Sequence, residues 1–122
     1  KTEDAIPYWD YDAPVTKETP RDVSAASVTA SAMIELSTMV PDGQKYLDYA
    51  EKILKSLSSD AYLAKVGDNQ GFILMHSVGS LPNGSEIDTP LNYADYYYLE
   101  ALKRFMELKK LKVENGELRV IQ

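Results

Sequence analysis

An aromatic ring and two carboxylates stand close together near the start of this 122-residue sequence, at Trp9, Asp10 and Asp12. Aromatic faces stack on sugar rings and carboxylates accept hydrogen bonds from sugar hydroxyls, so this group is typical of a sugar-binding loop. Two carboxylates also form the acid and base of a glycosidase. Loop aspartates, however, commonly accept hydrogen bonds from nearby backbone. We favour local structural roles for the aspartates and keep Trp9 as a candidate substrate-binding residue.

The single histidine, His76, follows the short apolar run from Phe72 to Met75. Its side chain titrates near neutral pH, so it could donate a proton or a hydrogen bond to a bound carboxylate. A lone histidine after apolar residues is also typical of a partly buried side chain with a structural partner. His76 is therefore a candidate substrate-binding residue, and the structural alternative stays open beside it.

A polar loop between the apolar run and the next helix offers hydroxyl and amide groups at Ser80, Asn83 and Ser85. These three residues are further candidates for substrate binding. Asparagine, glycine, proline and serine are also the ordinary residues of turns, so a loop without a ligand is the alternative.

Four tyrosines lie within the short run from Tyr93 to Tyr98. Helical geometry places Tyr93, Tyr96 and Tyr97 on one face and turns Tyr98 away. Tyr93, at the start of the helix, could reach a substrate cavity with its hydroxyl. We expect the other tyrosines to lie in the core, because aromatic side chains at helical spacing usually bury area.

Three helices are expected to position these residues. Asp22 is a natural N-cap for a helix that runs to about Thr38, and Arg21 beside it is expected to be exposed or ion-paired, with an anion site as the alternative. Apolar residues lie on two sides of this helix, which predicts that it is buried on both. The first side is formed by Val23, Ala26, Ala30, Met33 and Ile34, and the second by Val28, Ala32 and Leu36.

A second helix, predicted from about Gln44 to Leu57, has a single apolar stripe. The third is predicted to begin at Thr89 and Pro90, as N-cap and first helical residue, and to end near Leu111. The run from Phe72 to Met75 is expected to be extended or irregular. A turn at Glu114 to Glu117 predicts a short β-hairpin between residues 111–113 and 118–120.

The amino-acid composition limits the kinds of chemistry and of partner that this chain can have. The chain has no cysteine and one histidine, which excludes disulfides and thiolate chemistry and argues against a metal cluster. The net charge of −6 argues against nucleic acid as a partner. No apolar run approaches the about twenty residues of a membrane span, so no membrane association is expected. The compartment stays open between periplasm and cytoplasm.

Several segments carry a resemblance to a known family. The helix reads Tyr-Ala-Asp-Tyr-Tyr-Tyr-Leu-Glu-Ala-Leu-Lys-Arg from Tyr93 to Arg104, and it follows a His-Ser-Val segment at His76 and an Ile-Asp pair at Ile87. Upstream lie Tyr8-Trp9-Asp10-Tyr11-Asp12 and Pro20-Arg21-Asp22-Val23-Ser24-Ala25-Ala26. Together these segments resemble the last part of the unsaturated glucuronyl hydrolases of glycoside hydrolase family 88, a bacterial group of enzymes.

The resemblance implies an all-α fold, the C-terminal third of an (α/α)6 barrel, with residues 1–122 as one segment of a single domain. It implies an enzyme that hydrates the C4=C5 bond of an unsaturated uronic acid at the non-reducing end of lyase-generated oligosaccharides. No metal or organic cofactor is implied. The partners implied are the oligosaccharide and the remaining N-terminal helices of the barrel. Because the family's catalytic aspartates lie in those earlier helices, we expect this chain to be inactive alone.

The polar loop departs from the family. Some members bind a substrate sulfate with a Ser-x-x-Ser-x-Lys pattern, whose positions here are Ser80, Asn83 and Ser85. Loss of the lysine removes the charge that favours a sulfate, so a preference for sulfated fragments is in question. Two alternatives stay open: a rhamnogalacturonyl hydrolase-like enzyme with the same barrel, and a non-catalytic helical module that binds a saccharide or a protein.

Overall fold

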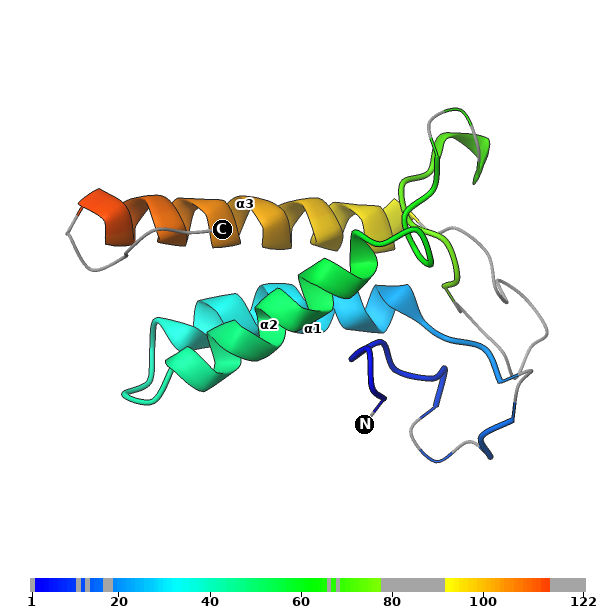
Figure 1. The fold of residues 1–122 in the computed structure, drawn as a ribbon, viewed down its shortest axis with the longest axis horizontal. Coiled ribbons are helices and arrows are strands. Elements are labelled where there is room, and N and C mark those ends of the chain that lie inside the picture. Colours follow the sequence, from blue (N-terminus) through cyan, green and yellow to red (C-terminus); the bar gives the residue numbers. More distant parts are fainter. Residues whose placement is uncertain are drawn as a thin grey trace.

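The computed structural model describes residues 2–10, 12, 14–16, 19–65, 67, 69–77 and 92–114, the last four of these and residue 70 by their backbone alone. Three α-helices dominate: α1 (Val23–Ser37), α2 (Gln44–Leu57) and α3 (Asn92–Glu114), with a short 3-10 turn at Asn69–Gly71. Figure 1 shows α1 and α3 running in one direction and α2 returning against them. Helix α1 packs on both of the others, which touch each other much less.

Helix α1 begins where the sequence predicts. The Asp22 carboxylate caps it by accepting a hydrogen bond of 3.0 Å from the Ser24 amide. Small side chains such as Ala26, Ala30 and Ser27 are fully or almost fully buried, and they let the neighbouring helices approach closely. The second apolar side is exposed in this chain, with Val28 at 40% and Leu36 at 37% exposure. The expectation that both sides are buried is therefore wrong for the chain taken alone.

Helix α2 has the predicted bounds and a single buried stripe formed by Leu47, Ala50, Ile53, Leu54 and Leu57. The turn before it brings the chain very close to the end of α1. A Cβ atom placed on Gly43 would lie 1.9 Å from the backbone oxygen of Ser37. Only glycine fits at this crossing, so the α1–α2 connection depends on that residue.

Helix α3 is longer than predicted. It continues through Glu114, so the prediction of a helix end near Leu111 and of a strand at residues 111–113 is wrong. The reason is local: the lysines, leucines and glutamates of this stretch are good helix formers, and they outweigh the turn signal that follows. The predicted start at Thr89 and Pro90 and the rest of the predicted hairpin lie outside the described residues.

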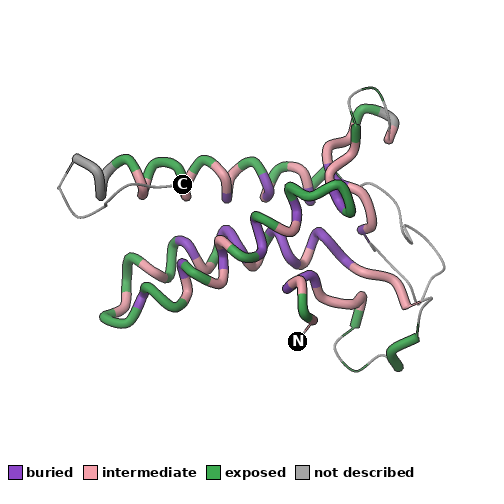
Figure 2. Tube along the Cα trace, in the orientation of Figure 1, coloured by how far each residue is buried: buried purple, intermediate pink, exposed green. Residues whose placement is uncertain are grey.

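The core lies around α1, where it meets α2, α3 and the N-terminal segment, and Ile6, Val23, Ile53 and Leu57 in it are completely or almost completely buried. Figure 2 shows the exposed residues of α3 along its outer side, away from the other two helices. Extended chain pairs in isolated bridges between Tyr8 and Arg21 and between Leu63 and Leu74. No described helix has the length and apolar character that a membrane span requires.

Candidate functional site

The described segments before α1 and after α2 lie at one end of the molecule, where α1 and α3 begin (Figure 1). The Trp9 amide donates to the Pro20 carbonyl at 3.0 Å, just before α1. The Val23 amide, in the first turn of α1, donates to the His76 carbonyl at 3.0 Å. The backbones of Trp9 and His76 are thus both joined to the residues that open α1.

The start of α3 is joined to the same loops by Asp95. Its two carboxylate oxygens accept hydrogen bonds from the amides of Ile73 (2.8 Å) and Leu74 (2.9 Å). These amides belong to the run before His76, which is irregular as predicted apart from the bridge at Leu74. Asp95 therefore fixes this segment against α3.

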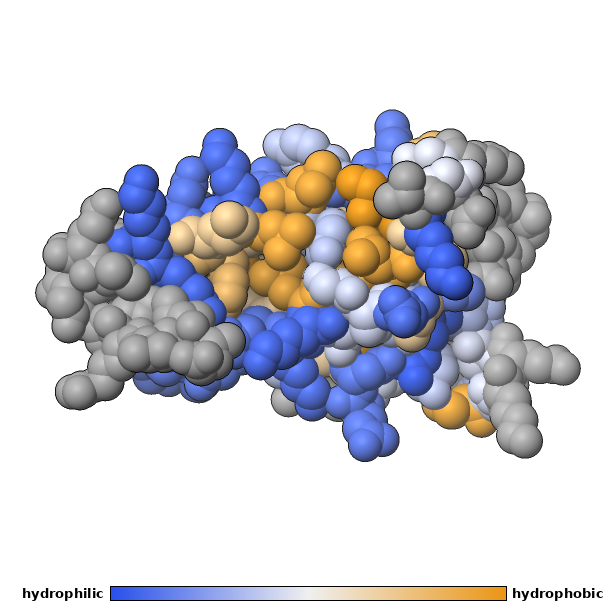
Figure 3. Space-filling model, turned by 45° about the horizontal axis from the view of Figure 1, so that its top comes forward, coloured by the Kyte–Doolittle hydropathy of each residue, from blue (hydrophilic) through white to orange (hydrophobic). Residues whose placement is uncertain are grey.

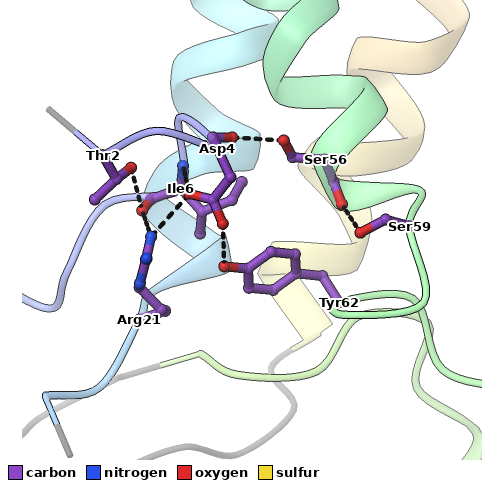
Figure 4. Close-up of polar contacts among 7 residues, drawn as sticks. All are labelled: Thr2, Asp4, Ile6, Arg21, Ser56, Ser59 and Tyr62. Atoms are coloured by element: carbon purple, nitrogen blue, oxygen red, sulfur yellow. Dashed lines mark hydrogen bonds and ion pairs between the residues drawn. The ribbon is translucent and has the colours of Figure 1, made fainter. Parts of the chain in front are cut away.

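A polar network around Asp4 connects three segments at this end (Figure 4). Asp4 Oδ1 accepts from Arg21 Nη1 at 2.8 Å and from the Ile6 amide at 3.1 Å. Asp4 Oδ2 accepts from the Tyr62 hydroxyl at 2.6 Å. Arg21 also donates to the Ile6 carbonyl at 2.5 Å and lies 4.4 Å from the centre of the Tyr8 ring. The structure therefore bears out the ion-paired interpretation of Arg21.

The network shifts the pKa values of Asp4 and Tyr62. Burial opposes ionisation of Asp4, but the hydrogen bonds from Tyr62 and Ile6 and the charge of Arg21 outweigh it, so the pKa of Asp4 lies below its ordinary value of 3.8. Burial, and then the hydrogen bond to the Asp4 carboxylate, raise the pKa of Tyr62 well above its ordinary value. At neutral pH the pair is therefore a carboxylate that accepts and a phenol that donates.

Trp9 lies half-buried in the N-terminal segment, and the Asp10 carboxylate after it has a local role. Asp10 Oδ1 accepts from the Asp12 amide at 2.9 Å, and both residues are exposed. This agrees with the expectation of local hydrogen bonding for Asp10. Nothing in this geometry brings the two carboxylates to opposite sides of a substrate.

His76 is half-buried and has a left-handed backbone conformation, with φ of 70°. Its ring meets the Tyr62 ring edge-on, with 6.0 Å between the ring centres. The ring therefore borders the Asp4 network through Tyr62. Both readings of His76, a structural side chain and a substrate contact, are compatible with this position.

The burial of the tyrosines in α3 differs in part from the prediction. Tyr93 is 42% exposed at the start of the helix, a position from which it could contact a substrate. Tyr98 is the buried one, and its hydroxyl lies 2.7 Å from the Ser58 hydroxyl. Tyr96 is 60% exposed, so its expected place in the core is wrong for this chain. The face with Ala94, Tyr98 and Ala101 packs inward because α1 lies on that side.

The other candidates, Ser80, Asn83 and Ser85, lie outside the described residues, and their role stays a prediction. A cavity of about 260 Å³ lies beneath the N-terminal segment and is lined by Tyr8, Tyr49, Thr2 and Thr29 among others. Trp9, His76 and Tyr93 do not line it. Within the described ranges, no group of three or more histidine or acidic side chains could hold a metal ion.

No sequence pattern predicted the contact between Asp4 and Tyr62. They are 58 residues apart, and neither lies in a recognisable motif. Only the packing of the N-terminal segment against the turn after α2 brings them together.

Several known proteins are similar to this chain. No family model matches the chain. An unsaturated glucuronyl hydrolase of Formosa agariphila is 49% identical over 105 residues, which are 86% of this chain and 26% of that protein. A solved unsaturated glucuronyl hydrolase specific for heparin superposes with a TM-score of 0.87 at 66% identity, covering 89% of this chain and 29% of the other.

A third match is a variant of the Streptococcus agalactiae enzyme complexed with dGlcA-GalNAc6S, with a TM-score of 0.76, 31% identity, and coverage of 84% of this chain and 28% of the other. The helical fold and these matches define part of a glycoside hydrolase. The chain spans between a quarter and a third of the length of these relatives, 26% to 29%. Within that class, it is similar to the corresponding part of proteins named unsaturated glucuronyl hydrolases.

Proposed function

We propose that this chain is the C-terminal segment of an enzyme that removes 4,5-unsaturated uronic acid from the non-reducing end of lyase-generated oligosaccharides. One observation carries the proposal: the superposition on a heparin-specific unsaturated glucuronyl hydrolase, with a TM-score of 0.87 at 66% identity. Residues 1–122 would form the last third of a single (α/α)6 barrel, with the other helices supplied by the preceding sequence.

In the proposed reaction, water adds across the C4=C5 bond of the uronic acid, with a proton going to C4 and the oxygen to C5. The hemiketal that forms at C5 then opens, and the neighbouring sugar is released. The proton donor is an aspartate of the preceding helices, since Asp10 and Asp12 are engaged locally or exposed in this chain. The chain alone is therefore inactive.

The contribution of this chain is one wall of the substrate site. Trp9, His76 and Tyr93 come from three loops or helix ends that meet where α1 begins, so one oligosaccharide could contact all three. Ser80, Asn83 and Ser85 follow His76 in the sequence and complete this wall in the proposal. The partner at the site is a saccharide, as in the relative complexed with dGlcA-GalNAc6S.

This chain has an exposed apolar surface against which the rest of the barrel could pack. Leu99 and Met106 on α3 are 52% and 67% exposed, and Val28 on α1 is 40% exposed. Figure 3 shows hydrophobic side chains gathered in the middle of the face that α3 crosses, with charged residues around them. Exposed apolar patches of this kind mark surfaces that pack against other protein. We assign this face to the preceding helices of the same enzyme.

The substrate we propose first is an unsaturated disaccharide of the heparin type. The match to the heparin-specific enzyme supports it. The loop sequence bears on the sulfation of that disaccharide: Ser85 stands where sulfate-binding members carry a lysine, and a neutral hydroxyl gives a sulfate no ion pair, so we propose the unsulfated form first.

A substrate panel tests the proposal. The full-length protein would be incubated with unsaturated disaccharides from heparin, chondroitin 6-sulfate and rhamnogalacturonan, while the ultraviolet absorbance of the double bond is followed. We expect the heparin disaccharide to be consumed fastest. Ser85→Lys should raise kcat/KM for the 6-sulfated chondroitin disaccharide by about tenfold, the value of one added charge-assisted contact. Ser59→Lys, on an exposed turn, is the matched control.

Two results would replace the proposal. Preference for the rhamnogalacturonan disaccharide would assign the chain to a rhamnogalacturonyl hydrolase-like enzyme. No consumption of any disaccharide by the folded full-length protein would favour a non-catalytic binding module.

A further inference from the structure

We infer that Asp4 is a positioning residue for the substrate: its carboxylate holds the segment that carries Trp9 and the segment that carries His76 in one fixed arrangement at the start of α1. The inference rests on the proposed function, since Trp9 and His76 are substrate contacts only there. Asp4 itself touches neither of them through its side chain.

The carboxylate joins segments that are distant in sequence. Its Oδ1 receives Arg21, from the residues just before α1, at 2.8 Å, and its Oδ2 receives Tyr62, from the turn after α2, at 2.6 Å. Both oxygens are therefore used, and each one fixes a different loop. Charge-assisted bonds of this length are directional, so they set positions as well as adding stability.

The Tyr62 side of the network leads to His76. The Tyr62 carbonyl accepts the Met75 amide at 2.8 Å, and the Tyr62 ring meets the His76 ring edge-on at 6.0 Å. A shift of the Tyr62 ring therefore moves a surface against which the imidazole rests.

The Arg21 side leads to Trp9. Arg21 lies over the Tyr8 ring at 4.4 Å while donating to Asp4 and to the Ile6 carbonyl. Tyr8 precedes Trp9, whose amide is bonded to Pro20. Loss of the Asp4 charge leaves the guanidinium held by the Ile6 carbonyl alone, which loosens the face on which Tyr8 is stacked.

Docking of the N-terminal segment does not depend on this carboxylate alone. The Asp4 backbone carbonyl accepts the Ser56 hydroxyl at 2.5 Å, and the Ile6 side chain is fully buried. Asp4→Asn keeps both contacts. This change should therefore leave the N-terminal segment in place but loosen the positions of the segments that carry Trp9 and His76. Substrate binding should be affected more than folding.

The test uses the full-length enzyme with Asp4→Asn, with Tyr62→Phe and with both changes. Asp42→Asn, which removes an exposed ion pair with Lys45, is the control. We expect each network variant to raise KM for the unsaturated heparin disaccharide by about tenfold with kcat nearly unchanged, because small misplacements of binding groups are costly. The double variant should be no worse than the more affected single one, since both remove the same link. The control should keep the unaltered KM.

A second measurement does not depend on activity. Hydrogen exchange should become faster at the Trp9 and Val23 amides in both single variants and stay unchanged in the control. If the unaltered enzyme consumes no disaccharide but exchange responds this way, the proposed function fails and the structural link stands. Unchanged KM and unchanged exchange in Tyr62→Phe, which removes only one hydroxyl, would overturn the inference.

Discussion

At the scale of single residues, Asp4 links the stability of this chain to pH. Its pKa in the folded protein lies below the ordinary value of 3.8, with burial working against the shift and hydrogen bonds and the Arg21 charge causing it. A carboxyl whose pKa is lowered by folding stabilises the native state at pH values above its unfolded pKa. That contribution is lost as the pH falls through the folded pKa.

Asp4→Asn should therefore lower the free energy of unfolding at pH 7 by about 1 kcal/mol, a modest value because both charged partners are partly exposed. The difference in the free energy of unfolding between the variant and the unaltered protein should have its full value above about pH 5. It should shrink below about pH 4, as the native carboxylate becomes protonated. Urea unfolding of the full-length protein between pH 3 and pH 7 measures it. A difference that stays constant with pH, or one that exposed Asp60→Asn reproduces, would contradict this assignment.

Local residue patterns predicted local contacts and missed distant ones. The cap at Asp22 and the hydrogen bond from Asp12 to Asp10 span two residues each, and rules for such short contacts anticipate them. The contacts of Asp4 span 17 and 58 residues. They depend on how the N-terminal segment packs over α1 and α2, which no spacing in the sequence encodes.

At the scale of elements, the crossing from α1 to α2 is set by Gly43. A Cβ atom there would lie 1.9 Å from the Ser37 carbonyl oxygen and 2.7 Å from its carbon. Both are backbone atoms that cannot rotate away, so any side chain would push the two helices apart.

Gly43→Ala should destabilise the protein by about 1–3 kcal/mol, the usual cost of forcing extra volume into a packed site. Gly67→Ala is the informative comparison, since its Cβ would meet nothing within 4 Å and only the φ of 88° opposes it. That change should cost about 1 kcal/mol. Thermal unfolding of the two variants would separate steric overlap from backbone strain, and equal stability of Gly43→Ala and the unaltered protein would refute the clash.

Helix caps and apolar periodicity predicted the bounds of the helices better than they predicted what surrounds each helix. They gave the start of α1 and both ends of α2, because those signals are local and strong. The hairpin prediction failed at residues 111–113, where helix-forming side chains extend α3. The second apolar side of α1 also showed a limit: a stripe predicts that a face can be buried, and not which chain segment covers it.

At the scale of the whole molecule, the described residues form three α-helices that pack around the first of them. The core joins α1 to α2, α3 and the N-terminal segment, while the outer side of α3 is exposed (Figure 2) and carries the exposed apolar residues Leu99 and Met106. The family relatives are several times longer, with this chain matching 26% to 29% of their length. The sequence motifs pointed to that family because they recur in order along the chain. They could not place the polar loop at Ser80 to Ser85, whose residues are typical of many turns.

The central claim is that this chain supplies a substrate wall and not the catalytic carboxylates. The most direct measurement follows the ultraviolet absorbance of the C4=C5 bond in an unsaturated heparin disaccharide, with equal molar amounts of the 122-residue chain and of the full-length protein. We predict steady loss of absorbance with the full-length protein and none with the chain, whose helical folding would be checked by circular dichroism. Loss of absorbance with the 122-residue chain alone would contradict the claim and make Asp10 and Asp12 the first residues to replace.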